Sequence, residues 1–216
     1  MQHRRDFLRW ASIASGTVVA GAALGCGEHP IATWDAAVPA DAAGQVCSPT
    51  RADVLGPFFV PGAPSRTKIA ADDEPGERIL LSGRVFTDDC ETPLAGALLD
   101  IWQADRDGVY HDAGTDFRLR GQVLTDADGR FMVDTIKPGN YTLAANVWRP
   151  AHIHFTASMP GHRPVTTQLY FQGDPYLPPN DGCGSCGSDD PDRVVELVGD
   201  AAAGWTAEWN IVLARA

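Results

Sequence analysis

Most of the chain is a series of short strand candidates separated by turns. From about residue 78 onward, runs rich in branched and aromatic residues alternate with turns that contain Asp, Gly or Pro. The strand candidates are residues 79–86, 94–102, 118–124, 130–134, 141–145, 151–158, 166–171, 194–198 and 208–214. Short strands with turn punctuation and no long amphipathic helix predict an all-β, antiparallel sandwich.

The composition agrees with one such domain and excludes some partners. A chain of 216 residues with 22 Gly and 16 Pro suits one domain plus extensions and disfavours a helical bundle. Its net charge of −11 argues against nucleic acid, because contact with phosphates requires clustered basic side chains. For the same reason we do not expect the folded body to bind an anionic membrane surface.

Residues 1–25 do not belong to the predicted sandwich. A basic start with Arg4 and Arg5 precedes an apolar run of small residues that is shorter than the roughly 20 residues of a membrane span. This pattern predicts a twin-arginine-like export signal, and therefore a periplasmic or outward-facing protein. Cys26 directly follows Gly25, so a lipid anchor at Cys26 and ordinary cleavage nearby both remain open. Residues 26–50 are predicted to be a linker, and residues 51–216 the folded domain.

Four further cysteines bear on the compartment and the fold. Disulfides are allowed in an exported protein, and four cysteines permit three pairings. Cys183 and Cys186 form a CxxC motif in a loop rich in Gly and Asp, and no second CxxC accompanies it. A structural disulfide is therefore favoured there over a redox pair or half of a zinc site. The sequence leaves the pairing of Cys47 and Cys90 with these residues open.

A His-x-His pair is the most informative chemical pattern. Residues i and i+2 of a strand point to the same face, so His152 and His154 can direct two imidazoles at one metal ion. The alternative is two partly exposed histidines on a polar strand face. A zinc site with three histidines would need His111 or His162. The sequence contains no Gly-x-Ser-x-Gly, Gly-x-Gly-x-x-Gly or phosphate-binding Gly-x-x-x-x-Gly-Lys motif.

Two of the four tyrosines follow turns in a similar way. Tyr110 comes after the turn at residues 105–108, and Tyr141 comes after Pro138 and Gly139. Each tyrosine alone would usually be a packing residue whose hydroxyl caps a turn. Together with the His-x-His pair they are compatible with a ferric iron site, because phenolate is a hard anionic donor that suits ferric iron.

Five motifs occur in one order, at residues 55–64, 100–110, 135–141, 149–155 and 166–171. In this order the sequence resembles the intradiol ring-cleavage dioxygenases, the catechol and protocatechuate dioxygenase family. The resemblance covers about residues 47–175. It implies a transthyretin-like β-sandwich with long active-site loops and one non-haem Fe(III) per chain. The export signal would place this chain in a small exported subgroup.

The resemblance also implies roles for individual residues. The iron ligands would be Tyr110, Tyr141, His152 and His154. The substrate would displace Tyr141, Arg149 would lie close to the substrate ring, and Gln168 would orient a ligand by hydrogen bonding. The catalytic residues would thus be Arg149, Tyr141 and Gln168. Arg149 would also contact the substrate, together with pocket residues Leu55, Pro57, Phe58 and Leu143.

The implied reaction uses a small aromatic diol and O2. A catechol-type ring would be cleaved between its two hydroxyl-bearing carbons, both atoms of O2 would be incorporated, and the product would be a cis,cis-muconate-type diacid. Two alternatives are a non-catalytic transthyretin-like binding domain and a zinc or copper protein that uses His152 and His154. The helical dimer domain of larger catechol dioxygenases has no counterpart before the core, so we leave the oligomeric state open.

Overall fold

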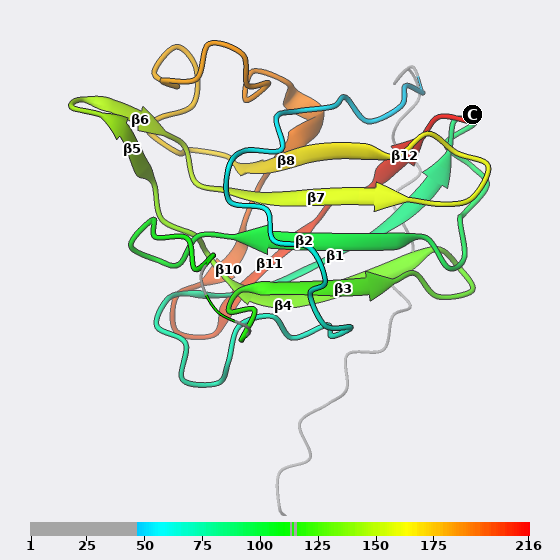
Figure 1. Cartoon of the computed structure of the whole chain (residues 1–216), viewed down its shortest axis with the longest axis horizontal. Helices are drawn as coiled ribbons and strands as arrows, with labels where there is room; N and C mark the ends of the chain where they lie inside the picture. The colour runs from blue at the N-terminus through cyan, green and yellow to red at the C-terminus, as the bar shows by residue number, and fades with distance from the viewer. Residues whose placement is uncertain (1–46, 113, 115) are drawn as a thin grey trace, which may run out of the picture. The chain divides into compact units, whose positions relative to one another are not determined.

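The computed structural model describes residues 47–216 except 113 and 115, and these residues form a sandwich of two β-sheets (Figure 1). The first sheet contains β1 (Arg78–Thr87), β4 (Arg130–Ile136), β10 (Val198–Asp200), β11 (Gly204–Glu208) and β12 (Ile211–Leu213). The second contains, in spatial order, β3 (Arg120–Leu124), β2 (Leu98–Gln103), β7 (His152–Ser158), β8 (Val165–Phe171) and β9 (Val194–Val195). The predicted all-β sandwich is confirmed.

Two smaller elements lie outside these sheets. A hairpin of β5 (Tyr141–Ala144) and β6 (Val147–Arg149) projects from one end of the sandwich (Figure 1). A single 3-10 turn, η1 (Pro191–Arg193), precedes β9. Within the described residues, no helix has the length and apolar character needed to cross a membrane. The predicted export signal, Cys26 and most of the predicted linker lie outside the described residues.

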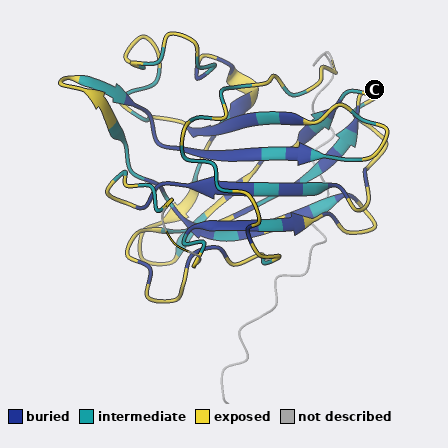
Figure 2. Cartoon of the chain, in the orientation of Figure 1, coloured by how far each residue is buried: buried dark blue, intermediate teal, exposed yellow. Residues whose placement is uncertain are grey.

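Alternating side chains of both sheets build the core. In β1, the odd-numbered residues, among them Ile79, Leu81 and Val85, are buried, whereas the even-numbered residues are partly or fully exposed. The facing strand β7 contributes Ile153 and Phe155 to the same apolar cluster. Figure 2 shows this burial concentrated along the central strands of the two sheets. Because the odd-numbered residues of β7 enter the core, its even-numbered residues must point to the outer face.

The strand pairing departs from the antiparallel prediction in three places. The strand β1 pairs in parallel with β11 through one half and with β12 through the other, and β8 pairs in parallel with β9. The predicted strand at residues 208–214 is divided because the Trp209 backbone turns toward β1. A Cβ at Gly83 would lie only 1.7 Å from the Trp209 carbonyl oxygen, so this close approach requires glycine.

Several predicted strand ends were also wrong, for local reasons. The strand β2 begins at Leu98 rather than Leu94, because Leu94 belongs to a turn that pairs with Val85. The strand β3 begins at Arg120 because Leu119 adopts a φ of 56°, which does not fit a strand. The predicted strand at 194–198 is divided between β9 and β10, and β6 was not predicted at all.

Two disulfides tie loops to the sandwich. The predicted disulfide between Cys183 and Cys186 is confirmed. Cys47 pairs with Cys90, across 43 residues of sequence, and attaches the start of the described chain to the turn that follows β1. Of the three pairings that four cysteines permit, the protein therefore has the one in which Cys47–Cys90 closes a long loop and Cys183–Cys186 closes a short one.

Candidate active site

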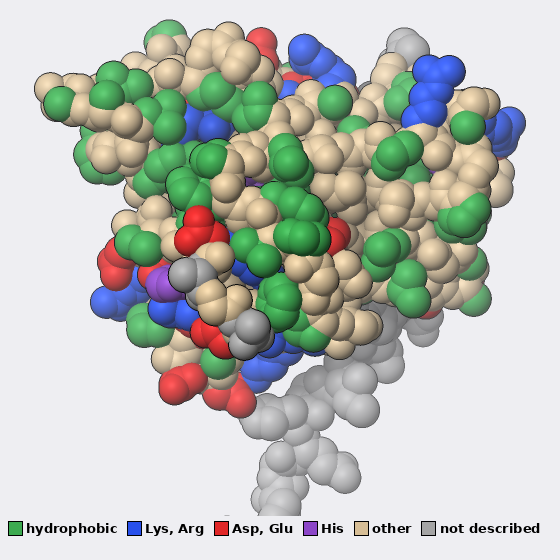
Figure 3. Space-filling view, viewed as in Figure 1, with side chains coloured by type: hydrophobic (Ala, Val, Ile, Leu, Met, Phe, Trp, Pro, Cys, Tyr) green, Lys and Arg blue, Asp and Glu red, His purple; other side chains and the backbone are tan. Residues whose placement is uncertain are grey.

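The outer face of the second sheet carries a continuous row of polar and aromatic side chains. Strand register places these side chains side by side, and cross-strand partners share a face. The first row consists of Arg120, Trp102, His154 and Gln168, and the adjoining pair consists of His152 and Tyr170. The segment before β1, cyan in Figure 1, runs across this face. Figure 3 shows hydrophobic side chains across the same face, with charged groups at the lower left and along the upper edge.

Three donor atoms converge at this row. The hydroxyl of Tyr110 lies 3.1 Å from Nε2 of His152 and 3.1 Å from Nε2 of His154. The Nδ1 of His152 lies 2.7 Å from the Pro150 carbonyl oxygen, which fixes the ring with its proton on Nδ1 and a lone pair on Nε2. The Nε2 of His154 can donate to or accept from the Tyr110 hydroxyl, whereas its buried Nδ1 has no hydrogen-bond partner among the described residues, so this cluster has a ring nitrogen that the protein itself leaves unpaired.

The charge states suit a cation. Burial is the main cause that lowers the pKa of His152 to about 3 and the pKa of His154 well below its ordinary value, so both rings are neutral ligands at neutral pH. Burial also raises the pKa of Tyr110 and of Tyr141. A bound metal ion reverses that effect by favouring phenolate. Two imidazoles with phenolate oxygens form a donor set that fits ferric iron.

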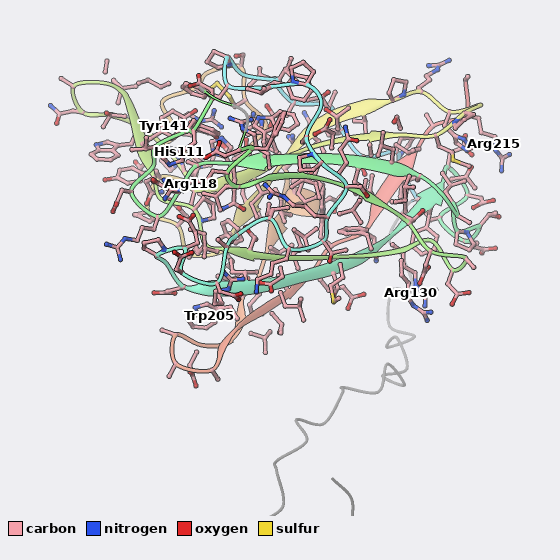
Figure 4. All side chains as sticks on the ribbon, turned by 60° about the horizontal axis from the view of Figure 1, so that its bottom comes forward. His111, Arg118, Arg130, Tyr141, Trp205 and Arg215 are labelled. Carbon is pink, nitrogen blue, oxygen red and sulfur yellow. A yellow bond between two sulfur atoms is a disulfide. The ribbon has the colours of Figure 1, made fainter. Side chains whose placement is uncertain are left out.

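Tyr141 begins β5 at the edge of this cluster. Its ring lies 5.7 Å from the rings of both Tyr110 and His152, measured between centroids. Figure 4 shows Tyr141 at the same end of the molecule as His111 and Arg118. Its partly exposed position differs from the complete burial of the histidines. Tyr141 is therefore the member of the predicted ligand set that is best placed to move.

One carboxylate fixes the backbone on both sides of the site. Oδ2 of Asp174 accepts a hydrogen bond from the Asn140 side chain at 2.7 Å and another from the Ala151 backbone at 2.9 Å. Asn140 precedes Tyr141, and Ala151 precedes His152. Asp174 therefore joins the turn that carries one predicted ligand to the strand that carries two others.

The loop that carries Tyr110 is fixed in a similar way. Asp105 accepts backbone hydrogen bonds from Asp107 and Val109, and its other oxygen lies 2.9 Å from Nε2 of His111. His111 is thereby engaged outside the donor cluster. His162 is the other residue considered for a three-histidine zinc site. The hydrogen-bond contact of its ring runs from Nδ1 to the Pro160 carbonyl oxygen at 3.4 Å. Among the described residues, no group of three or more His, Cys, Asp or Glu side chains gathers as a metal site.

Arg149 is buried beside the donor cluster, as the cross-strand partner of Tyr141 in the β5–β6 hairpin. It donates to Oε1 of Gln168 at 2.8 Å and to the Tyr170 hydroxyl at 3.1 Å. Gln168 in turn donates to the Val54 carbonyl oxygen at 2.8 Å. We expected Gln168 to orient a metal ligand, but these hydrogen bonds attach it to Arg149 and to the covering segment. Its effect on the site therefore passes through the arginine.

The predicted pocket residues differ in their contacts. Phe58 stacks on Tyr110 with a centroid distance of 4.2 Å and an interplanar angle of 10°. Leu55 and Pro57 are exposed on either side of Gly56, where an added Cβ would lie 3.5 Å from the His154 ring. Leu143 is 53% exposed on β5. Phe58 thus contacts the donor cluster, Leu55 and Pro57 flank a glycine that lies against His154, and Leu143 is exposed on the projecting hairpin.

Comparison with known proteins now becomes informative. A family model described as "Dioxygenase" matches residues 54–214, well over half of the chain. The chlorocatechol 1,2-dioxygenase of Rhodococcus opacus is 37% identical over 163 residues, which cover 65% of this chain and 63% of the relative. The chain belongs to the intradiol ring-cleavage dioxygenase family. The matched region spans just under two thirds of the length of that curated relative.

Solved structures of intradiol dioxygenases share this fold. One is the dioxygenase domain of a dioxygenase–carbohydrate-binding protein fusion from Streptomyces sp. SirexAA-E. It matches with a TM-score of 0.66 at 38% identity, covering 78% of this chain and 100% of that chain. The 3-chlorocatechol 1,2-dioxygenase of Rhodococcus opacus 1CP matches with a TM-score of 0.70 at 29% identity, covering 77% and 73%.

The candidate site also contains residues that the sequence interpretation missed. Tyr170 is fully buried, and its hydroxyl donates to Asp53 or Gln168. It could have been found from its spacing, because Tyr170 is two residues after Gln168 on the same strand face. Asp174 and Asp105 lie in loops, where no periodic pattern marks them.

Proposed function

We propose that this protein is a non-haem Fe(III) dioxygenase that cleaves a catechol-type ring between the two hydroxyl-bearing carbons. The product would be a cis,cis-muconate-type diacid that contains both atoms of O2. The observation that carries the proposal is the convergence of the Tyr110 hydroxyl and two histidine Nε2 atoms at 3.1 Å. Family membership supports the reaction class. The names of relatives, such as chlorocatechol 1,2-dioxygenase, support an aromatic diol as substrate.

Four residues would hold the metal: Tyr110, Tyr141, His152 and His154. When bound, Fe(III) would supply Lewis-acid chemistry that acidifies the substrate hydroxyls and makes the ring reactive toward O2. Tyr110 and the two histidines are held by the fold and would remain in place. Tyr141, at the edge, would serve as the base that accepts a proton from a substrate hydroxyl.

Arg149 and Gln168 would act on the substrate side of the site. The guanidinium of Arg149 can stabilise negative charge that develops on the substrate without transferring a proton. Gln168 holds Arg149 at 2.8 Å and thereby limits its movement. Phe58, stacked on Tyr110, would pack against the aromatic ring, with Leu55, Pro57 and Leu143 at the entrance.

The test begins with the iron-loaded protein. A ferric phenolate site absorbs visible light, so we expect a red-brown protein with one Fe per chain and oxygen uptake with simple catechols. Tyr141→Phe should weaken the visible band and slow turnover. The matched control is Tyr176→Phe, because Tyr176 stacks on Trp148 rather than on the donor cluster. A colourless protein with full zinc occupancy, or one that consumes no oxygen with any catechol, would contradict the proposal.

We also propose that the chain is exported and is periplasmic or anchored at an outward-facing membrane. Two disulfides among the described residues support an oxidising compartment. The signal-like residues 1–25 and the candidate lipid site Cys26 supply the rest of the argument. Cell fractionation of the wild type and of Cys26→Ser tests it. A lipid-anchored protein moves from the membrane to the soluble fraction on this substitution, and a cytoplasmic location of the wild type would refute export.

A further inference from the structure

The loop at residues 181–188 contains the Cys183–Cys186 disulfide, and we call it the disulfide-closed loop. It packs directly against Arg149. Oδ1 of Asp181 lies 3.0 Å from Nε of Arg149, and both side chains are only 4% exposed. The buried Nε of Arg149 makes no hydrogen bond among the described residues, so this contact is an ion pair. Among the described residues, Asp181 is the one carboxylate paired with Arg149. A buried guanidinium without such a partner is strongly unfavourable, so Asp181 determines where this charge can rest.

The disulfide-closed loop holds Asp181 in turn. The Cys183 backbone donates to Oδ1 of Asp181 at 2.9 Å, and the buried Ser188 hydroxyl donates to Oδ2. Cys183 and Cys186 form the disulfide between these two donors. The covalent link therefore restrains both groups that orient the carboxylate.

The same loop is fixed to the protein at both ends. At its start, the Gly182 backbone donates to the Trp148 carbonyl oxygen at 2.7 Å, one residue before Arg149. At its end, the Gly187 backbone donates to Oδ2 of Asp53 at 3.2 Å. Neither glycine has room for a side chain: an added Cβ would lie 2.4 Å from Val147 and 1.6 Å from Arg193, respectively.

We propose that Asp181 is a positioning residue for Arg149, and that the Cys183–Cys186 disulfide keeps Asp181 in place. The inference rests on the proposed function, because it assigns Arg149 to the reaction. The disulfide then serves the active site rather than the stability of the sandwich. Loss of groups that orient a site residue typically reduces activity about 10–100-fold. Because Arg149 acts on charge that develops during the reaction, kcat should fall more than KM rises.

Three variants separate the steps. Cys183→Ser/Cys186→Ser removes the covalent closure, and Cys47→Ser/Cys90→Ser is the matched control that removes a disulfide elsewhere. Asp181→Asn retains an oxygen for the Cys183 backbone and an amide for Ser188, but it loses the charge that pairs with Arg149.

The first readout is deuterium uptake of the metal-free protein, which does not depend on activity. We expect Cys183→Ser/Cys186→Ser to increase uptake in residues 147–149 as well as in residues 181–188, and the control to change neither segment. Asp181→Asn should leave uptake in residues 181–188 near the wild-type level. Unchanged uptake in residues 147–149 of the Cys183→Ser/Cys186→Ser variant would overturn the coupling, whatever the enzyme does.

The second readout is kinetics with catechol at matched iron content. Asp181→Asn should reduce kcat by about 10–100-fold with a smaller change in KM. Wild-type kcat in Asp181→Asn would overturn the positioning role. A wild-type protein that cleaves no catechol would instead refute the proposed function and leave the exchange experiment to decide the coupling between loop and arginine.

Discussion

Replacing Asp174 by alanine tests whether one carboxylate joins the two halves of the metal site. The substitution removes the acceptor for Asn140 and Ala151, and also for the Tyr176 backbone at 2.9 Å. Ala151 is 1% exposed, so its N–H would be left buried and unpaired. The two other donors are less buried and can find water. Hydrogen bonds to charged groups contribute about 1.5–3 kcal/mol, and an unsatisfied buried N–H costs about 1–3 kcal/mol.

From these terms we expect Asp174→Ala to lower the free energy of unfolding by about 2–4 kcal/mol. For a domain of this size, 1 kcal/mol changes Tm by about 2–4 °C, so Tm should fall by roughly 4–16 °C. Thermal unfolding of the metal-free protein, followed by circular dichroism, measures this change. Iron affinity should also fall about 10–100-fold, because Asp174 holds the backbone next to Tyr141 and His152.

Asp200 provides the matched control. Its carboxylate also accepts backbone hydrogen bonds, from Ala202 and Ala203 at 2.8 Å each, but in an exposed turn where water can replace it. Asp200→Ala should leave Tm close to the wild-type value and iron binding unchanged, because water can replace the lost acceptor. Equal Tm values for Asp174→Ala and Asp200→Ala would refute the reasoning.

Two other predictions follow from buried groups. In the unfolded chain, His152 and His154 become protonated below about pH 6.5. In the metal-free folded protein they stay neutral there, because burial lowers the pKa of His154 well below its ordinary value and the pKa of His152 to about 3. The free energy of unfolding therefore has its full value above pH 6.5. Below that pH it falls by about 1.4 kcal/mol per pH unit for each histidine. Urea unfolding between pH 6.5 and pH 5 measures how the free energy of unfolding depends on pH, and this slope should be about half as large in His152→Asn as in the wild type. Equal slopes for the two proteins would contradict the prediction. Gly83→Ala should destabilise the protein by at least about 3 kcal/mol, because its Cβ would lie 1.7 Å from the Trp209 carbonyl oxygen. The control is Gly184→Ala, whose Cβ would meet no atom within 4 Å and which should leave the free energy of unfolding unchanged in the same assay.

The fold and the donor cluster could be predicted because their patterns are local. Alternation in β1 and β7 marks the core face, and the spacing of His152 and His154 places both rings on the other face. The two tyrosines follow turns that the sequence shows directly. The parallel pairing of β1 with β11 could not be predicted, because it depends on how distant segments return across the sheet.

The supporting contacts could not be predicted for a related reason. Asp174 lies 34 residues from Asn140 and 23 residues from Ala151 in the sequence, and it occupies an irregular loop. In a chain with 28 acidic residues, nothing local distinguishes a buried loop carboxylate from a solvated one. The same holds for Asp181, which the sequence presents only as one acid in a Gly- and Asp-rich stretch.

The supporting carboxylates fall into two groups whose energetic coupling should differ. Asp53 accepts from Tyr170 and Arg193, and its hydrogen bond to Gly187 attaches it to the loop that presents Asp181. Asp53 and Asp181 therefore restrain one loop, whereas Asp174 binds different partners. Substitutions at contacting or networked residues couple by about 0.5–3 kcal/mol, and substitutions without shared partners add. Unfolding of the single and double asparagine variants should show coupling for Asp53 with Asp181 and additivity for Asp174 with Asp181. Additivity in both cycles would mean that the loop does not transmit strain between its two ends.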